Sequence, residues 1–267
     1  SLHEAVHSGK SKMGWIEWGA TEIGDVNDEA RWYEFNPSMG ILLDHAAVKG
    51  EAEQMQPDVF ARERLGWWSP VGGKGIYALI SKKWRDCEVA SAPREGKLAF
   101  GVKFSHDSLH AAVSWALADR DGPSYVELYD VMGSSGGTVA ISDMLLRNRD
   151  EIACVCIDGK SGADALRRRI LDGGFPKTAL VMGTPAIVQA ASSMLSDEVN
   201  AGTLSHIASP ALDDSATGSL KRDVGRDGWG FADGPNSMAA PIESASLALW
   251  AARTTKRDPR REQEASF

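Results

Sequence analysis

The pattern of apolar residues changes partway along this chain, and that change constrains the fold more than any other feature. From Leu98 to Phe104, large apolar residues alternate with smaller or polar ones, a period of two that is typical of a β-strand. Two further strand-like runs follow at 110–118 and 125–132, and the turn 119–123 separates them. We therefore predict three consecutive strands that form an antiparallel meander.

Helices and strands alternate after this meander. Residues 152–157 are continuously apolar, as in a strand buried on both faces. Thr184, Pro185 and Gly202 are suited to cap, begin and terminate a helix. The predicted elements are helix 138–148, strand 152–157, helix 162–171, strand 178–182, helix 185–201 and helices near 210–220 and 241–253. This order matches an α/β fold with an RNase H-like mixed β-sheet flanked by helices, although several α/β folds begin in the same way.

The first part of the chain has a different residue pattern. It is rich in tryptophan and shows little strand-like alternation. Asp44 can cap a helix over 46–56, Pro57 suits the first turn of a second helix, and 69–75 is rich in glycine and proline. We therefore divide the chain into a mainly helical segment, residues 1–75, and an α/β domain, residues 76–267.

Composition limits the class of protein. No run of eighteen or more residues is apolar, so we expect no membrane span, and residues 1–13 lack the apolar centre of a signal peptide. Cys87, Cys154 and Cys156 give no disulfide framework, which favours a reducing cytoplasm, and the last two are expected to be small buried hydrophobes. The net charge of −8 argues against coating nucleic acid, but a nuclease remains possible because bound metal ions supply positive charge.

The motif SGKS at residues 8–11 resembles part of a phosphate-binding loop. That loop needs a glycine five residues before Gly9, where this chain has Glu4, and a strand before it, which the sequence does not indicate. We therefore predict no nucleotide site and no ATPase activity in this chain.

Asp158 is the strongest candidate for chemistry. It directly follows the buried strand 152–157 and precedes Gly159 and a helix, so it should lie at the carboxyl edge of the sheet, where ligands gather. Divalent cations prefer such oxygen ligands, and phosphodiester cleavage with two metals needs several carboxylates at one place. A carboxylate here can instead cap the following helix, and spacing alone does not separate the two roles.

Three stretches of the sequence resemble the large subunit of phage and prophage terminases. The first is WYEFNPSMG with MQPDVFARERLGWW, similar to the passage that joins the ATPase part to the nuclease part. The second is the pair LAFGVKFSHD and VCIDGKSGA. The third, HIASPALDDSATGSLKRDVGRDGWGFADG with PIESASLALWAA, resembles the end of the nuclease domain in terminases of actinobacterial phages. Residues 1–75 would then be a helical linker from the ATPase part, and residues 76–267 an RNase H-like nuclease domain.

This resemblance implies a function in viral genome packaging. An ATPase of the family moves DNA into a procapsid, and the nuclease domain cuts the concatemeric double-stranded DNA with Mg²⁺ or Mn²⁺. The implied partners are double-stranded DNA, a portal and a small terminase subunit in the cytoplasm of a bacterial host, and no membrane.

Carrying over the metal ligands of the family leaves two gaps. The carboxylate of the first strand falls on Lys103, the second falls on Asp158, and the third falls on Met238. Acids that lie near the gaps could replace the missing ligands, and they are Asp107, Asp233 and Glu243.

Lys103 allows two interpretations. In an RNase H-like sheet the first strand lies beside the strand that ends at Asp158, so the lysine could take the place of a cation. Such a contact is worth about 4 kcal/mol of attraction at about 4 Å and an effective dielectric constant of about 20, before desolvation. Alternatively, Asp107 supplies the missing carboxylate and Lys103 contacts a phosphate.

Our first hypothesis is a metal-dependent DNA endonuclease. Asp158, Asp107 and Glu243 would be catalytic, and Asp158, Asp107 and Asp233 would hold two ions of Mg²⁺ or Mn²⁺. Basic residues that would contact DNA are Lys103, Lys160, Arg167 and Arg168. The alternative is a catalytically inactive nuclease-like domain, either a degenerate prophage remnant or a module that docks on DNA or the portal. Lys103 and Met238 favour this alternative.

Overall fold

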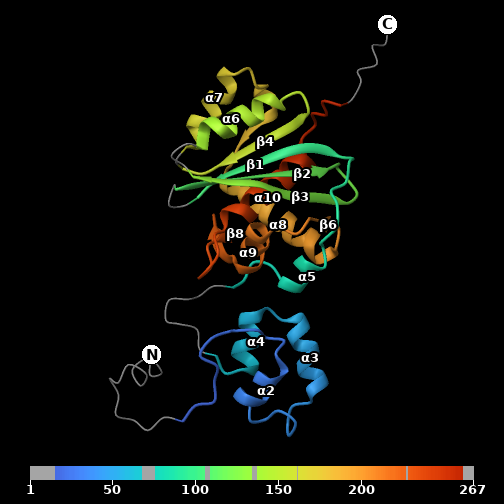
Figure 1. Ribbon diagram of the computed structural model, residues 1–267, viewed down its shortest axis with the longest axis vertical. Coiled ribbons are helices and arrows are strands. Elements are labelled where there is room, and N and C mark those ends of the chain that lie inside the picture. Colours follow the sequence, from blue (N-terminus) through green and yellow to red (C-terminus); the bar gives the residue numbers. More distant parts are fainter. Residues whose placement is uncertain are drawn as a thin grey trace, which may run out of the picture. The chain divides into compact units, whose positions relative to one another are not determined.

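The computed structural model describes residues 16–67, 76–105, 109–133, 137–160, 162–226 and 228–260. The chain divides into two compact units, Ser1–Ile80 and Ser81–Phe267 (Figure 1). The domain boundary that we expect between residues 75 and 76 stays a prediction. In the part of the chain that the structure describes, no helix is long and apolar enough to cross a membrane.

The first unit is helical. Among its residues that the structure describes, the helices are α2 (Glu29–Phe35), α3 (His45–Gln54) and α4 (Pro57–Arg64). Asp44 caps α3 as predicted, because its carboxylate accepts a hydrogen bond from the Ala47 amide. The side chains of Trp32 and Phe60 are buried against each other in the core of this unit.

The second unit is built on a mixed sheet of six strands in the order β5-β4-β1-β2-β3-β6. β1 and β2, and β2 and β3, are antiparallel, whereas β4 lies parallel to β1 and β5 parallel to β4. An antiparallel meander that continues through its first strand into two parallel strands is the RNase H-like arrangement, so the predicted fold is confirmed. The strands are β1 (Lys97–Phe104), β2 (His110–Ala118), β3 (Ser124–Gly133), β4 (Ile152–Asp158), β5 (Leu180–Met182) and β6 (Leu204–Ser205).

One face of the sheet packs against α6 (Gly137–Arg147) and α7 (Ala163–Asp172), which lie together above it in Figure 1. The core on this side contains Phe100, Val102 and Phe104, the even-numbered residues of β1. Since side chains alternate along a strand, the odd-numbered residues of β1 point to the other face.

The other face is covered by α10 (Ala240–Thr254), with α8 (Pro185–Ala201) packed beside it. Gly101 of β1 permits this close packing, because a Cβ atom there would lie 2.0 Å from the Ser244 carbonyl oxygen. The hydroxyls of Ser114 and Ser244 lie 2.6 Å apart across the same interface. α10 therefore lies directly against β1 and β2, close to the residues that follow Gly101.

Cys154 and Cys156 of β4 are buried and unbonded, as expected for small hydrophobes. Burial raises the pKa of Cys154 to about 11 and raises that of Cys156 further. Both thiols are therefore neutral and unreactive in the folded chain.

Several elements differ from the prediction. The helix α9 (Pro210–Gly218) ends before Leu220, and a hairpin of β7 (Leu220–Val224) and β8 (Gly228–Ala232) follows it. A short helix α5 (Ser81–Arg85) and the strand β6 also had no clear sequence signal, since segments of two to five residues are too short to show a period.

Candidate functional site

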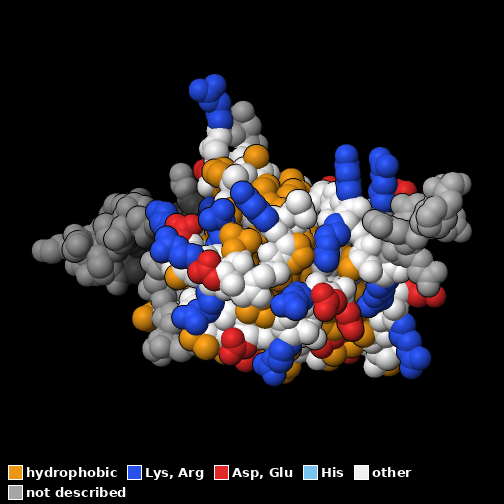
Figure 2. Space-filling view, turned by 90° about the horizontal axis from the view of Figure 1, so that it is seen from above, with side chains coloured by type: hydrophobic (Ala, Val, Ile, Leu, Met, Phe, Trp, Pro, Cys, Tyr) orange, Lys and Arg blue, Asp and Glu red, His pale blue; other side chains and the backbone are white. Residues whose placement is uncertain are grey.

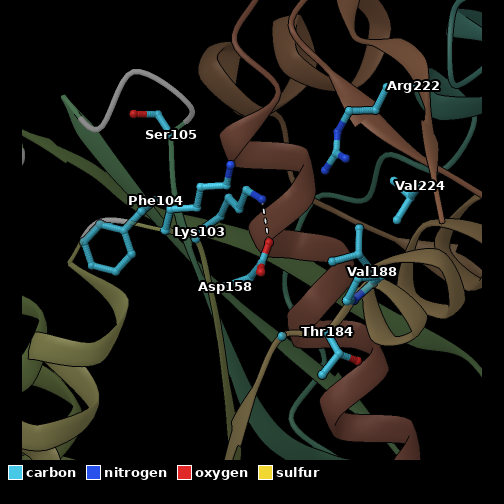
Figure 3. A pocket seen from close by; sticks show the side chains of 12 residues that line it. Lys103, Phe104, Ser105, Asp158, Thr184, Val188, Arg222 and Val224 are labelled. Atoms are coloured by element: carbon cyan, nitrogen blue, oxygen red, sulfur yellow. Dashed lines mark hydrogen bonds and ion pairs between the residues drawn. The ribbon is translucent and has the colours of Figure 1, made fainter.

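The site begins where β1 and β4 end side by side. The two strands are parallel, and Lys103 and Asp158 are Cα partners in their ladder. Lys103 belongs to the odd-numbered residues that face α10, so its stem is buried and its ammonium reaches along the sheet to the carboxylate. Lys103 Nζ lies 2.5 Å from Asp158 Oδ2 (Figure 3). Of the two interpretations of Lys103, the structure therefore contains the contact with Asp158.

Helix α10 brings a second carboxylate to the same ammonium. Glu243 lies in the first turn of α10, and its Oε2 is 3.4 Å from Lys103 Nζ. Its Oε1 accepts a hydrogen bond of 3.0 Å from Arg222 of β7. Burial raises the pKa of the Glu243 carboxyl, and the charges of Lys103 and Arg222 oppose that shift. Four charged groups from β1, β4, β7 and α10 thus form one connected cluster.

A cavity of about 520 Å³ opens beside this cluster, at the carboxyl ends of β1 and β4. Figure 3 shows Lys103 reaching across to Asp158, with Arg222 extending toward them from another element. The cavity also includes the beginning of α8, where Thr184 caps the helix. Its lining residues are Lys103, Phe104, Ser105, Asp158, Gly159, Lys160, Gly183, Thr184, Pro185, Val188, Arg222 and Val224.

Two glycines lie close to the end of β4, and each faces a different neighbour. A Cβ atom on Gly183 would lie 2.6 Å from both the Cβ and the Oδ1 of Asp158. Gly159 has a φ of +132°, which strains other residues, and a Cβ atom there would lie 2.7 Å from that of Phe104. Gly183 therefore leaves space for the Asp158 carboxylate, and Gly159 leaves space for Phe104.

The structure brings together some of the predicted site residues. Asp158, Glu243 and Lys103 meet in the cluster, and Lys160 lines the cavity. Asp107 lies outside the described residues.

Asp233 lies near the cluster but has another partner. Its Oδ1 accepts a hydrogen bond from the Ala239 amide, just before α10, and it lines a separate cavity of about 60 Å³ together with Glu243. The carbonyl of Met238 accepts a hydrogen bond from the Ser215 hydroxyl. Met238 and Asp233 therefore help to fix the start of the helix that presents Glu243.

Arg167 and Arg168 lie on α7, on the other side of the sheet from α10, and neither lines the cavity. Figure 2 looks down on the end of the domain that bears α6 and α7 in Figure 1, and Lys and Arg side chains stand out from this face. A contact of Arg167 and Arg168 with DNA stays a prediction.

Arg222 was not among the predicted site residues. It shares the face of β7 with Leu220 and Val224, and that face alternates with the exposed Lys221 and Asp223. The sequence signal for Arg222 was therefore a charged residue at a position where the alternation of the strand calls for an apolar one. The partner of Arg222 lies 21 residues further along the chain and could not be read from the sequence.

The described residues do not fit a pair of divalent metal ions. Such a pair needs several carboxylates that face a common point and are free to bind it. Here the point between Asp158 and Glu243 is taken by the Lys103 ammonium. Among the residues that the structure describes, no group of three or more His, Cys, Asp or Glu side chains could hold a metal ion.

Strand order and site define an RNase H-like domain whose carboxylates at the sheet edge are paired with cations of the protein. Comparison with protein-family models and with curated proteins gives no match. The solved structures similar to this chain include large terminases of several phages and their nuclease domains.

The large terminase of bacteriophage HK97 matches with a TM-score of 0.47 and 15% identity, over 94% of this chain and 60% of that protein. The large terminase nuclease of the thermophilic phage G20c matches with a TM-score of 0.46 and 11% identity, over 63% of this chain and 95% of that one. Structures of the same nuclease with bound magnesium, cobalt and zinc are also similar. Thermus thermophilus RuvC matches with a TM-score of 0.33 and 15% identity, over 60% of this chain and 98% of that one.

Proposed function

We propose that this chain is the RNase H-like domain of a viral genome-packaging terminase, and that the cavity beside Asp158 holds the phosphate backbone of double-stranded DNA. The motifs that resemble terminases and the RNase H-like strand order support the class of protein. The resemblance to phage terminases also implies partners. We propose a portal and a small terminase subunit, in a bacterial host.

The charge of the cavity lining is the observation that carries the DNA contact. Lys160 lines the cavity, and the N-terminus of the 17-residue helix α8 opens into it. Arg222 also lines the cavity, but it is paired with Glu243. Among the described residues that line the cavity, Asp158 is the only acid, and the Lys103 ammonium neutralises it. Arginine, lysine and helix N-termini are the groups that contact phosphate, so a locally positive cavity can bind DNA although the whole chain has a net charge of −8.

Lys160 offers the cleanest test, because it is exposed and forms no ion pair with another residue that the structure describes. In Lys160→Ala, we expect binding of a short DNA duplex to weaken roughly tenfold at low salt, since a hydrogen bond to a charged group contributes about 1.5 kcal/mol. The slope of log K against log salt should fall by about 0.9, the value for one phosphate contact. Fluorescence anisotropy at several salt concentrations measures both.

Lys177→Ala is the matched control, because Lys177 is also exposed but precedes β5, at the opposite end of that strand from the cavity. This variant should bind DNA like the original chain. Equal losses in both variants, or no binding of DNA by the original chain, would exclude the cavity as the DNA site.

Metal-dependent cleavage of DNA is the second candidate. It is favoured by one observation: Asp158 and Glu243 come from different elements and converge on one point at the sheet edge. Plasmid nicking with added Mn²⁺ or Mg²⁺ tests it. Nicking that is lost in Asp158→Asn would establish the endonuclease, whereas intact plasmid in the presence of bound protein would leave the DNA-holding role.

A further inference from the structure

The carboxylate site contains its own cations. Lys103 Nζ lies 2.5 Å from Asp158 and 3.4 Å from Glu243, and Arg222 lies 3.0 Å from the second oxygen of Glu243. With both acids ionised, two negative and two positive charges cancel within this cluster. A divalent cation added to it would therefore bring an excess of positive charge.

The position of Lys103 also excludes a metal ion sterically. Divalent cations bind carboxylate oxygens at about 2.0–2.6 Å, and the ammonium already occupies that space beside Asp158 Oδ2. The Lys103 side chain is 6% exposed and its backbone is fixed in the β1–β4 ladder. Moving it aside would leave buried charges without partners, which is costly.

We infer that Lys103 is the resident cation of this site, so that the site binds no divalent metal ion, and that a carboxylate at position 103 would convert it into a divalent-metal site. In Lys103→Asp, three carboxylates and Arg222 would leave a net charge of −2, which matches one divalent cation. This inference goes beyond the DNA contact proposed above, and metal binding can be measured without DNA.

Calorimetric titration of the full chain with Mn²⁺, in the absence of DNA, tests the inference. The original chain and its Asp158→Asn variant should give the same titration, because Asp158 holds no metal. Lys103→Asp should gain a binding event that disappears in the double variant Lys103→Asp/Asp158→Asn. Mn²⁺ binding to the original chain that Asp158→Asn abolishes would overturn the inference, as would a folded Lys103→Asp variant that gains no binding.

Lys103→Met provides a second test that does not depend on the folding of Lys103→Asp. Methionine keeps an unbranched stem but lacks the charge, so Asp158 and Glu243 lose their shared cation. We expect the thermal midpoint to fall by roughly 10 °C and Mn²⁺ to restore part of it. A midpoint equal to that of the original chain would show that Lys103 is not the balancing cation. Duplex binding by the same variants reports separately on the DNA contact.

Discussion

At the scale of single residues, Gly101 decides how closely α10 can approach the sheet. It lies two residues before Lys103 on the same face of β1, and it faces the backbone of Ser244 and Ala248. Because Glu243 precedes Ser244 in the helix, the distance from Glu243 to Lys103 depends on this close contact. A residue without a side chain therefore sets the geometry of a charged cluster.

Gly101→Ala should destabilise the second unit by about 3 kcal/mol. The added Cβ would lie 2.0 Å from the Ser244 carbonyl oxygen and 2.6 Å from the Ala248 amide, so the helix would have to move. Urea unfolding followed by circular dichroism measures the loss. Gly133→Ala is the control, since nothing lies within 4 Å of a Cβ atom at this position at the end of β3. Similar midpoints for the two variants would contradict the proposed close packing.

The residue pattern allowed part of the site to be predicted. Asp158 follows a continuous apolar strand, which places it at the carboxyl edge of a sheet whatever the detailed topology. Glu243 was a candidate only as an acid near the last helix, because its role depends on how α10 packs on Gly101. Contacts between residues far apart in the sequence depend on the tertiary structure, so the local pattern of residues does not predict them.

At the scale of elements, the N-terminus of α8 forms part of the wall of the cavity. Its N-cap residue directly follows Gly183, whose missing side chain makes room for Asp158, and its first residues line the cavity. Thr184 fixes this beginning, because its hydroxyl accepts a hydrogen bond of 3.3 Å from the Ile187 amide. The helix also ends as the sequence predicts, at Gly202 in the left-handed conformation.

Thr184→Ala should reduce the stability of the second unit by about 1 kcal/mol, the usual cost of losing an N-cap side chain. Ser209→Ala is the matched control, because Ser209 occupies the N-cap position of α9 without a side-chain capping bond. We expect this control to change stability by less than about 0.5 kcal/mol. Chemical denaturation of both variants decides the matter, and an equal loss in both would show that the Thr184 cap contributes nothing.

Elements with a strong local signal were predicted to within a few residues, whereas the β7–β8 hairpin was not. β2 has its predicted bounds, His110–Ala118, and α8 has its predicted cap and terminator. β7 contains three charged residues in five, which lowers its resemblance to a strand. Its strand conformation depends on pairing with β8 and packing beside α8.

At the scale of the whole molecule, each of the two compact units has a hydrophobic core of its own. The first unit buries Trp32, Phe60 and Leu65, and the second buries residues of its sheet against α6 and α7. A unit with its own core can unfold independently of its neighbour along the chain. The residue pattern changes between the helical segment and the α/β domain, and the two parts also pack around separate cores.

Thermal unfolding should therefore show two transitions that respond to different substitutions. Phe60→Ala removes a fully buried ring from the first core and should cost about 3–5 kcal/mol, enough to lower one transition by roughly 10 °C or more. Leu166→Ala, in the second core, should lower the other transition and leave the first in place. Differential scanning calorimetry resolves the two. If either substitution lowered both transitions together, the two units would unfold as one, and the prediction of independent unfolding would be wrong.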